Sequence, residues 1–135
     1  MATLKQLDEI DELESDSNDI PISMLEPEVK LIFHSPDSDE RLAFGPGVAE
    51  LCIGIKKYGS LKQAAAQMGM HYSKAWKIIG EAEDALQITL VIKEPPKGYK
   101  LTPRGEELLR GYLQIAEDAS NYVKFRFQQI FPEEE

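Results

Sequence analysis

Residues 59–76 read GSLKQAAAQMGMHYSKAW, and this stretch decides the predicted fold. Ser60 stands three residues before Gln63, which is the spacing of a capping box at a helix N-terminus. Three alanines follow, with high helix propensity and so little bulk that a second helix can approach closely. Gly69 stands where a helix ends with a residue of positive φ. We predict a short helix between Ser60 and Gly69, with an apolar stripe of Leu61, Ala65 and Met68.

The residues after Gly69 predict a second helix that starts near His71. Its expected buried face, at helical spacing, consists of Tyr72 in part, Ala75, Ile79, Ala82 and Leu86. The opposite face carries His71, Ser73, Lys74 and Lys77. Two short helices joined by a tight turn are typical of a helix-turn-helix unit, which places its second helix in the DNA major groove. An ordinary helical hairpin within a core is the alternative interpretation.

A β-hairpin is expected directly after the second helix. Residues 88–93 (ITLVIK) are rich in β-branched side chains and predict a strand, residues 94–98 (EPPKG) a turn, and residues 99–101 the returning strand. Thr102 and Pro103 then open another helix, as its N-cap and its first helical residue. This order of elements is that of a winged helix. Its wing would bring lysines to the DNA backbone or minor groove, namely Lys93, Lys97 and Lys100. A merely solvated hairpin is the alternative.

Several short segments occur in a specific order and spacing. They are residues 44–47 (FGPG), 59–61 (GSL), 64–65 (AA), 68–76 (MGMHYSKAW), 90–91 (LV) and 101–105 (LTPRG). On these segments, residues 44 to 110 or so resemble the winged-helix domain of the molybdate-responsive regulator (ModE) family. They resemble the DNA-binding domain of LysR-type regulators more distantly. Tyr72, Ala75 and Trp76 together favour the ModE type. The resemblance implies a DNA-binding winged helix that is commonly a dimer.

The resemblance also implies which residues contact DNA, because Tyr72, Ser73, Lys74 and Lys77 match recognition-helix positions. The full predicted set is Ser60, His71, Tyr72, Ser73, Lys74, Lys77, Lys97 and Lys100. Trp76 is expected to pack the helix against the domain, since indole offers one donor and a large apolar surface. His71 departs from the usual serine of the family, and residues 94–98 depart from its glycine-rich wing. The C-terminal β domains that bind molybdate in full-length members have no counterpart, so no molybdate binding is expected.

The formal net charge of −9 contrasts with the basic footprint of most DNA-binding domains. Residues 1–40 contain 2 Lys+Arg and 12 Asp+Glu, and residues 111–135 contain 2 and 5. Residues 41–110 contain 11 and 7, a net charge of +4. The candidate DNA-binding segment is therefore the only basic part of the chain. Since net charge governs association rather than fold, this local value is the relevant one.

The N-terminal part is predicted to contain an acidic tail and a hairpin. Residues 1–26 are highly charged and poor in aromatic side chains, so they are expected to be disordered or weakly helical. This tail is either a solubilising segment or an arm that competes with DNA for the basic helix. Residues 28–34 and 41–44 are predicted strands. A helix from Pro46 to about Tyr58 follows, with Val48, Leu51, Cys52, Ile55 and Tyr58 at core spacing.

The last predicted helix runs from about Pro103 to Ile130. Its two apolar rows are Leu108, Tyr112, Ile115, Ala119 and Tyr122, and Leu109, Leu113, Ala116, Val123, Phe127 and Ile130. So wide an apolar face exceeds what a small winged domain covers, so we expect this helix to pair with its copy in a homodimer. Folding back onto its own domain is the alternative.

These elements define a mainly α fold with small β-hairpins (α+β). We expect an acidic tail at residues 1–26, a winged helix-turn-helix domain with an N-terminal hairpin at 27–102, a dimerisation helix at 103–131 and an acidic tail at 132–135.

The sequence thus predicts a cytoplasmic, homodimeric regulator of transcription that binds double-stranded DNA without a cofactor. A winged-helix protein-interaction module that has lost DNA binding is the alternative. An enzyme is not expected, because no phosphate loop, nucleophile elbow or paired-carboxylate motif is recognisable. His34, His71 and Cys52 lack metal-site spacing, and Cys52 is expected to be a buried, unreactive thiol. No apolar run is long enough to predict a membrane span or a signal peptide.

Overall fold

The computed structural model describes residues 19–36 and 42–133. The elements, in chain order, are η1 (Ile22–Met24), β1 (Phe33–His34), β2 (Leu42–Phe44), α2 (Pro46–Tyr58), α3 (Leu61–Gln67), α4 (Tyr72–Leu86), β3 (Val91–Lys93), β4 (Tyr99–Leu101) and α5 (Pro103–Ile130). Residues 28–123 form one compact unit, and the described residues up to Pro27 and from Lys124 onward form another. The mainly helical fold with small antiparallel hairpins is the predicted one.

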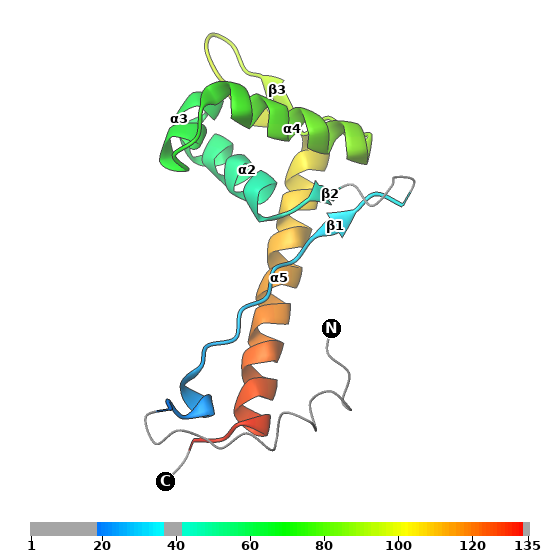
Figure 1. Ribbon diagram of the computed structural model, residues 1–135. Coiled ribbons are helices and arrows are strands. Elements are labelled where there is room, and N and C mark those ends of the chain that lie inside the picture. The colour runs from blue at the N-terminus through cyan, green and yellow to red at the C-terminus, as the bar shows by residue number, and fades with distance from the viewer. Residues whose placement is uncertain (1–18, 37–41, 134–135) are drawn as a thin grey trace. The chain divides into compact units, whose positions relative to one another are not determined.

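The three helices α2, α3 and α4 pack against one another and form most of the core (Figure 1). Small residues let α2 and α3 approach closely, since a Cβ added at Gly54 would lie 2.5 Å from the Ala64 Cβ. Ser60 caps α3 by accepting a hydrogen bond from Gln63 N–H at 3.2 Å. Gly69 takes φ +69° in the turn before α4, as expected. The predicted helix-turn-helix geometry is therefore confirmed.

The buried face of α4 is close to the predicted one. Ala75, Ile79 and Ala82 are buried as expected, together with Ala85. Two expectations were wrong in part, because Tyr72 is exposed and Leu86 is only half-buried. The reason for the exposed Tyr72 is that the first turn of α4 extends past the core toward the wing, so its ring has only Trp76 beside it as a ring partner on the helix.

The wing, which we define as the β3–β4 hairpin of residues 91–101, projects beyond α3 and α4 (Figure 1). Val91 pairs with Leu101, Ile92 with Lys100 and Lys93 with Tyr99. The strand predicted at residues 88–93 is shorter than expected and starts at Val91. The Glu83 carboxylate explains this start, because its Oε2 accepts hydrogen bonds from Leu90 N–H at 2.7 Å and Val91 N–H at 3.3 Å.

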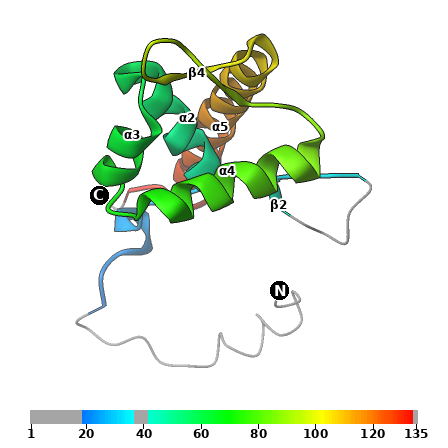
Figure 2. The ribbon, with the colours of Figure 1, turned by 90° about the horizontal axis from the view of Figure 1, so that it is seen from above.

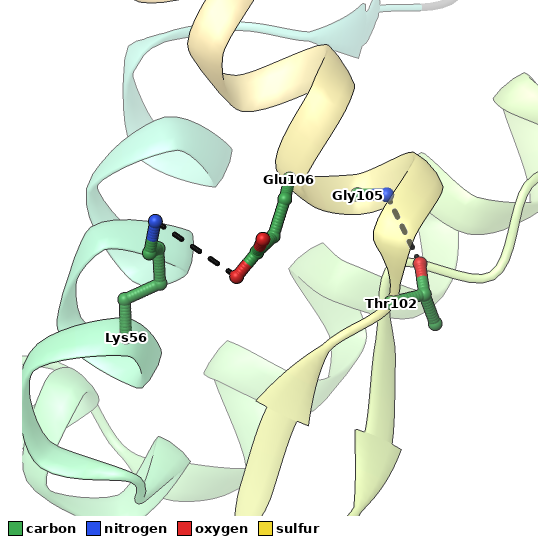
Figure 3. Close-up of polar contacts among 4 residues, drawn as sticks. All are labelled: Lys56, Thr102, Gly105 and Glu106. Atoms are coloured by element: carbon green, nitrogen blue, oxygen red, sulfur yellow. Dashed lines mark hydrogen bonds and ion pairs between the residues drawn. The ribbon is translucent and has the colours of Figure 1, made fainter.

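Figure 3 shows two contacts at the start of α5, a cap within the helix and an ion pair with α2. Thr102 is the predicted N-cap, and its Oγ1 accepts a hydrogen bond from Gly105 N–H at 3.0 Å. Glu106 in the first turn forms an ion pair with Lys56 of α2, with 3.8 Å between Nζ and Oε1. Thr102 N–H also donates to the Leu90 carbonyl at 2.9 Å, which ties the start of α5 to the residue before β3.

The N-terminal hairpin is shorter than predicted. The strand expected at residues 28–34 is confined to Phe33–His34, which pair with β2, while Arg41 lies outside the described residues. Residues 28–32 pack along α5 instead of pairing, because the Leu31 carbonyl accepts a hydrogen bond from the Tyr112 hydroxyl at 2.8 Å. Phe33, Phe44 and Tyr112 then form a cluster of ring contacts, with centroids 5.0–6.4 Å apart.

Beyond its first third, α5 has no fully buried residue in the part of the chain that the structure describes. Its buried residues, Gly105, Leu109 and Tyr112, all lie in the first third of the helix. Apolar side chains farther along are 41–64% exposed, namely Leu113, Ile115, Tyr122, Phe125 and Ile130. In the described part of the predicted tail, Ile20, Ile22, Met24 and Leu25 are also exposed. The rest of the acidic run at residues 8–19 falls outside the described residues except for Asp19.

Candidate nucleic-acid interface

The first two turns of α4 present a polar, basic surface. His71 is the N-cap residue, with φ −68° and ψ 147°, and its side chain makes no capping hydrogen bond. The predicted residues of this helix are all exposed: His71, Tyr72, Ser73, Lys74 and Lys77. Ser73, Lys74 and Lys77 project from the side of the helix opposite the buried Ala75 and Ile79, whereas the Tyr72 ring lies beside Trp76. This is the arrangement that a major-groove reading helix requires.

The charge of α4 changes sign along its length. Lys74 and Lys77 lie in the N-terminal half, whereas Glu81, Glu83 and Asp84 lie in the C-terminal half. No acidic side chain of residues 19–36 and 42–133 lies within ion-pair distance of either lysine. Glu83 is occupied by its hydrogen bonds to the start of β3. A polyanion would therefore be attracted to the N-terminal half of α4 and repelled by the C-terminal half.

The wing adds a second set of basic side chains. Lys93, Lys97 and Lys100 are exposed, and Ile92 beside them is 39% exposed. The root of the wing is tied to the turn before α3, where Tyr99 N–H donates to the Gly59 carbonyl at 3.0 Å. Gly98 permits this approach, since a Cβ there would lie 2.7 Å from the Gly59 oxygen. The wing is therefore held beside the helix-turn-helix unit and does not depend on β3–β4 pairing alone.

An aromatic bridge, which we define as Tyr72, Trp76 and Tyr99, links the start of α4 to the wing. The ring centroids of Tyr72 and Trp76 are 6.2 Å apart and those of Trp76 and Tyr99 are 5.0 Å apart, both edge-to-face. Partial burial and then a side-chain hydrogen bond with Tyr72 raise the pKa of Tyr99. Trp76 is half-buried against the core cluster, which fits its predicted packing role.

A cleft of about 430 Å³ opens between α3, the start of α4 and the wing. Residues 60–62, Tyr72 and residues 93–99 line it. Figure 2 shows from above how the hairpin passes close to α3. The cleft brings together the predicted residues Ser60, Tyr72 and Lys97, whereas His71, Ser73, Lys74 and Lys77 lie along α4 and Lys100 lies on β4 outside the cleft lining.

Lys62 also lines the cleft and was not among the predicted contact residues. It is exposed in the first turn of α3, two residues after the Ser60 cap. The sequence signal for it was its position outside the buried stripe of Leu61 and Ala65, but sequence spacing alone does not show that the wing returns beside this turn.

Other chemistry-bearing groups lie apart from this surface. Cys52 is fully buried in α2, and burial followed by repulsion from Glu83 raises its pKa to about 12. The expected burial of Cys52 is therefore confirmed. Within the described ranges, no group of three or more metal-ligating side chains could hold an ion. No helix in the described part of the chain is both long and apolar enough to span a membrane.

Comparison with protein families bears on this geometry. Residues 49–106 match the family model of the bacterial regulatory helix-turn-helix proteins, lysR family. These residues are thus similar to the helix-turn-helix domain of that family. The match starts within α2 and ends in the first turn of α5, so it includes α3, α4 and the wing. No curated protein gives a significant match to the chain. This similarity supports DNA binding and transcriptional regulation as the role of residues 49–106.

Proposed function

We propose that the protein is a homodimeric transcriptional regulator of the ModE-like winged-helix type that inserts α4 into the DNA major groove. The observation that carries the proposal is the exposed N-terminal half of α4, where Lys74 and Lys77 lack acidic partners among the described residues. Tyr72, Ala75 and Trp76 support the ModE-like type. We propose no molybdate site, no cofactor and no catalysed reaction, and we place the protein in the cytoplasm, where bacterial DNA lies.

The homodimer rests on the exposed apolar side chains of α5. A monomer would leave Leu113, Ile115, Tyr122, Phe125 and Ile130 in contact with water. Exposed apolar side chains in such number on one helix indicate an interaction surface, and a second copy of the same helix offers a matching one. A twofold dimer would place two α4 helices about one DNA turn apart and would require a pseudo-palindromic operator.

Binding of the purified protein to DNA tests this function directly. Fluorescence anisotropy would compare a duplex from upstream of the protein's own gene with a random duplex of equal length, from about 50 to 200 mM salt. We expect preference for one duplex and a steep fall in affinity with salt, because released counterions drive contacts between lysines and phosphates. Weak binding with no preference and no salt dependence would contradict the proposal.

The protein-interaction module remains the second candidate because of two observations. The chain is acidic outside residues 41–110, and Glu94 stands within the wing. A module of this kind would keep the fold and the apolar α5 surface while losing affinity for DNA. The anisotropy experiment separates the two candidates, since only the regulator shows a salt-dependent preference for one duplex.

A further inference from the structure

The cleft between α3 and the wing has the composition of an anion site. Lys62 reaches it from α3, and Lys93 and Lys97 reach it from the wing, against one carboxylate, Glu94. None of the three lysines has an ion-pair partner in the part of the chain that the structure describes. Three unpaired ammonium groups around one opening repel one another, and an anion placed among them relieves that repulsion.

The hydroxyl groups of the cleft fit the same ligand. Ser60 Oγ accepts the cap hydrogen bond from Gln63 N–H, so its own proton remains available to a further acceptor. Tyr72 brings a phenol from α4 to the same lining. A phosphate oxygen accepts hydrogen bonds from both lysine and hydroxyl donors, whereas an apolar ligand would leave these donors unsatisfied.

The walls of the cleft are held at a fixed separation. Tyr99 N–H bonds to the Gly59 carbonyl, and the Tyr99 ring packs edge-on against Trp76. The wing side of the cleft is thereby attached to both the turn before α3 and the side of α4. A site whose donors are held in place by surrounding contacts loses less entropy when it binds its ligand.

We propose that this cleft binds one phosphate of the DNA backbone, with Lys62 contributing from α3 and Lys93 and Lys97 from the wing. The inference rests on the proposed DNA binding and adds a single phosphate-binding site shared by two elements far apart in sequence. The aromatic bridge acts as its positioning element. Tyr72 then serves as a wall and a phosphate donor of the cleft, in place of reading a base.

Salt-dependent DNA binding of single-lysine variants tests the proposal. Lys62→Ala is expected to make the slope of log affinity against log salt shallower by about one, and equally for operator and random duplexes. Lys97→Ala should act in the same way. Lys124→Ala, which removes a lysine outside the winged unit, is the matched control and should leave the slope unchanged. Thermal unfolding of each variant confirms that the domain is folded.

A scan of the operator's phosphates identifies which phosphate the cleft binds. Single neutral methylphosphonates would replace each backbone phosphate of the operator in turn. We expect one position per half-site where this replacement weakens the wild type but no longer weakens either Lys62→Ala or Lys97→Ala. If the two variants lose sensitivity at different phosphates, or if neither changes the slope while DNA still binds, the inference is overturned and the proposed function stands. If the wild type does not bind DNA, the proposed function itself fails.

The positioning role of the bridge has its own readout, because Trp76 is the single tryptophan of the chain. Tyr99→Leu should shift Trp76 emission and, like Lys97→Ala, abolish the loss of affinity that methylphosphonate replacement causes at the shared phosphate. Tyr99→Phe keeps the ring contact and should retain both. An unchanged phosphate scan in a folded Tyr99→Leu protein would refute the positioning role.

Discussion

Large apolar side chains are buried in the winged domain, whereas several of them are exposed along the outer part of α5. In the domain, Phe44, Leu51, Ile55, Leu61, Ile79 and Leu90 are fully buried, and the surface of α4 and the wing is polar and basic. Along α5 beyond Tyr112, several large apolar side chains are exposed instead, namely Leu113, Ile115, Tyr122, Phe125 and Ile130. The polar, basic surface of the winged domain covers a buried apolar core and is therefore free to bind a polyanion. A surface with uncovered apolar groups requires a partner to be stable in water.

The largest expected effect comes from adding charge to the uncovered surface. Tyr122→Glu/Phe125→Glu should convert a dimer into a monomer in analytical ultracentrifugation, because burying two carboxylates in an apolar interface is unfavourable. Affinity for a palindromic operator should fall about 100-fold through loss of two-site binding. Tyr122→Phe serves as the conservative control. If the double variant sediments as a dimer like the wild type, α5 does not form the dimer interface.

The second effect concerns the close packing inside the domain. Gly54→Ala should lower the free energy of unfolding by about 1–3 kcal/mol, because the new Cβ collides with Ala64 and forces α2 and α3 apart. Gly80→Ala in α4 is the matched control, since no atom lies within 4 Å of its Cβ position. It should stabilise the protein slightly by raising helix propensity. Thermal unfolding measures both, and a neutral Gly54→Ala would contradict the described packing.

A somewhat smaller loss of stability is expected from removing the Glu83 carboxylate, which binds the start of β3 in the wing. Glu83→Ala leaves the N–H groups of Leu90 and Val91 without their carboxylate partner, at a cost of about 1–2 kcal/mol in denaturant unfolding. Glu81→Ala on the same helix removes an exposed carboxylate and should change stability little. Equal effects of the two substitutions would show that Glu83 does not hold the start of β3.

The smallest expected effect is the contribution of Cys52 to the pH dependence of the protein's stability. Burial raises the pKa of Cys52 from 9.0 to about 12, so the folded state favours the neutral thiol. This contribution to stability is complete below the unfolded pKa near 9 and is lost as pH rises from there toward 12. Thiol-reagent kinetics at pH 8 should show labelling only on unfolding. Rapid labelling of folded protein would place Cys52 outside the core.

Local sequence signals were sufficient for most of the fold. Pro46, Ser60, Gly69 and Thr102 mark helix ends through their backbone preferences and caps, so the predicted bounds of α2, α3 and α5 agree with the structure. The prediction at residues 28–34 was too long because Leu31 bonds to Tyr112, which lies 81 positions away in the chain. A distant partner of this kind leaves no periodic signal.

The candidate site could likewise be predicted only where it depends on residues close together in the sequence. The exposed residues of α4 follow from helical spacing, because one face is alanine and isoleucine and the other is polar. The cleft does not, because Lys62 and Lys97 come together only through the contacts of Tyr99 with Gly59 and Trp76. His71, which departs from the usual serine of the resembled family, starts α4 without a capping hydrogen bond from its side chain.

The most direct test of the central claim is the DNA affinity of Lys74→Ala/Lys77→Ala measured across salt concentrations. If the N-terminal half of α4 binds in the major groove, the slope becomes shallower by about two and the preference for the operator over a random duplex falls. Lys124→Ala/Arg126→Ala removes the same charge from the far part of α5 and should keep both properties. Unchanged slope and preference in the α4 variant, with the fold intact, would contradict the account.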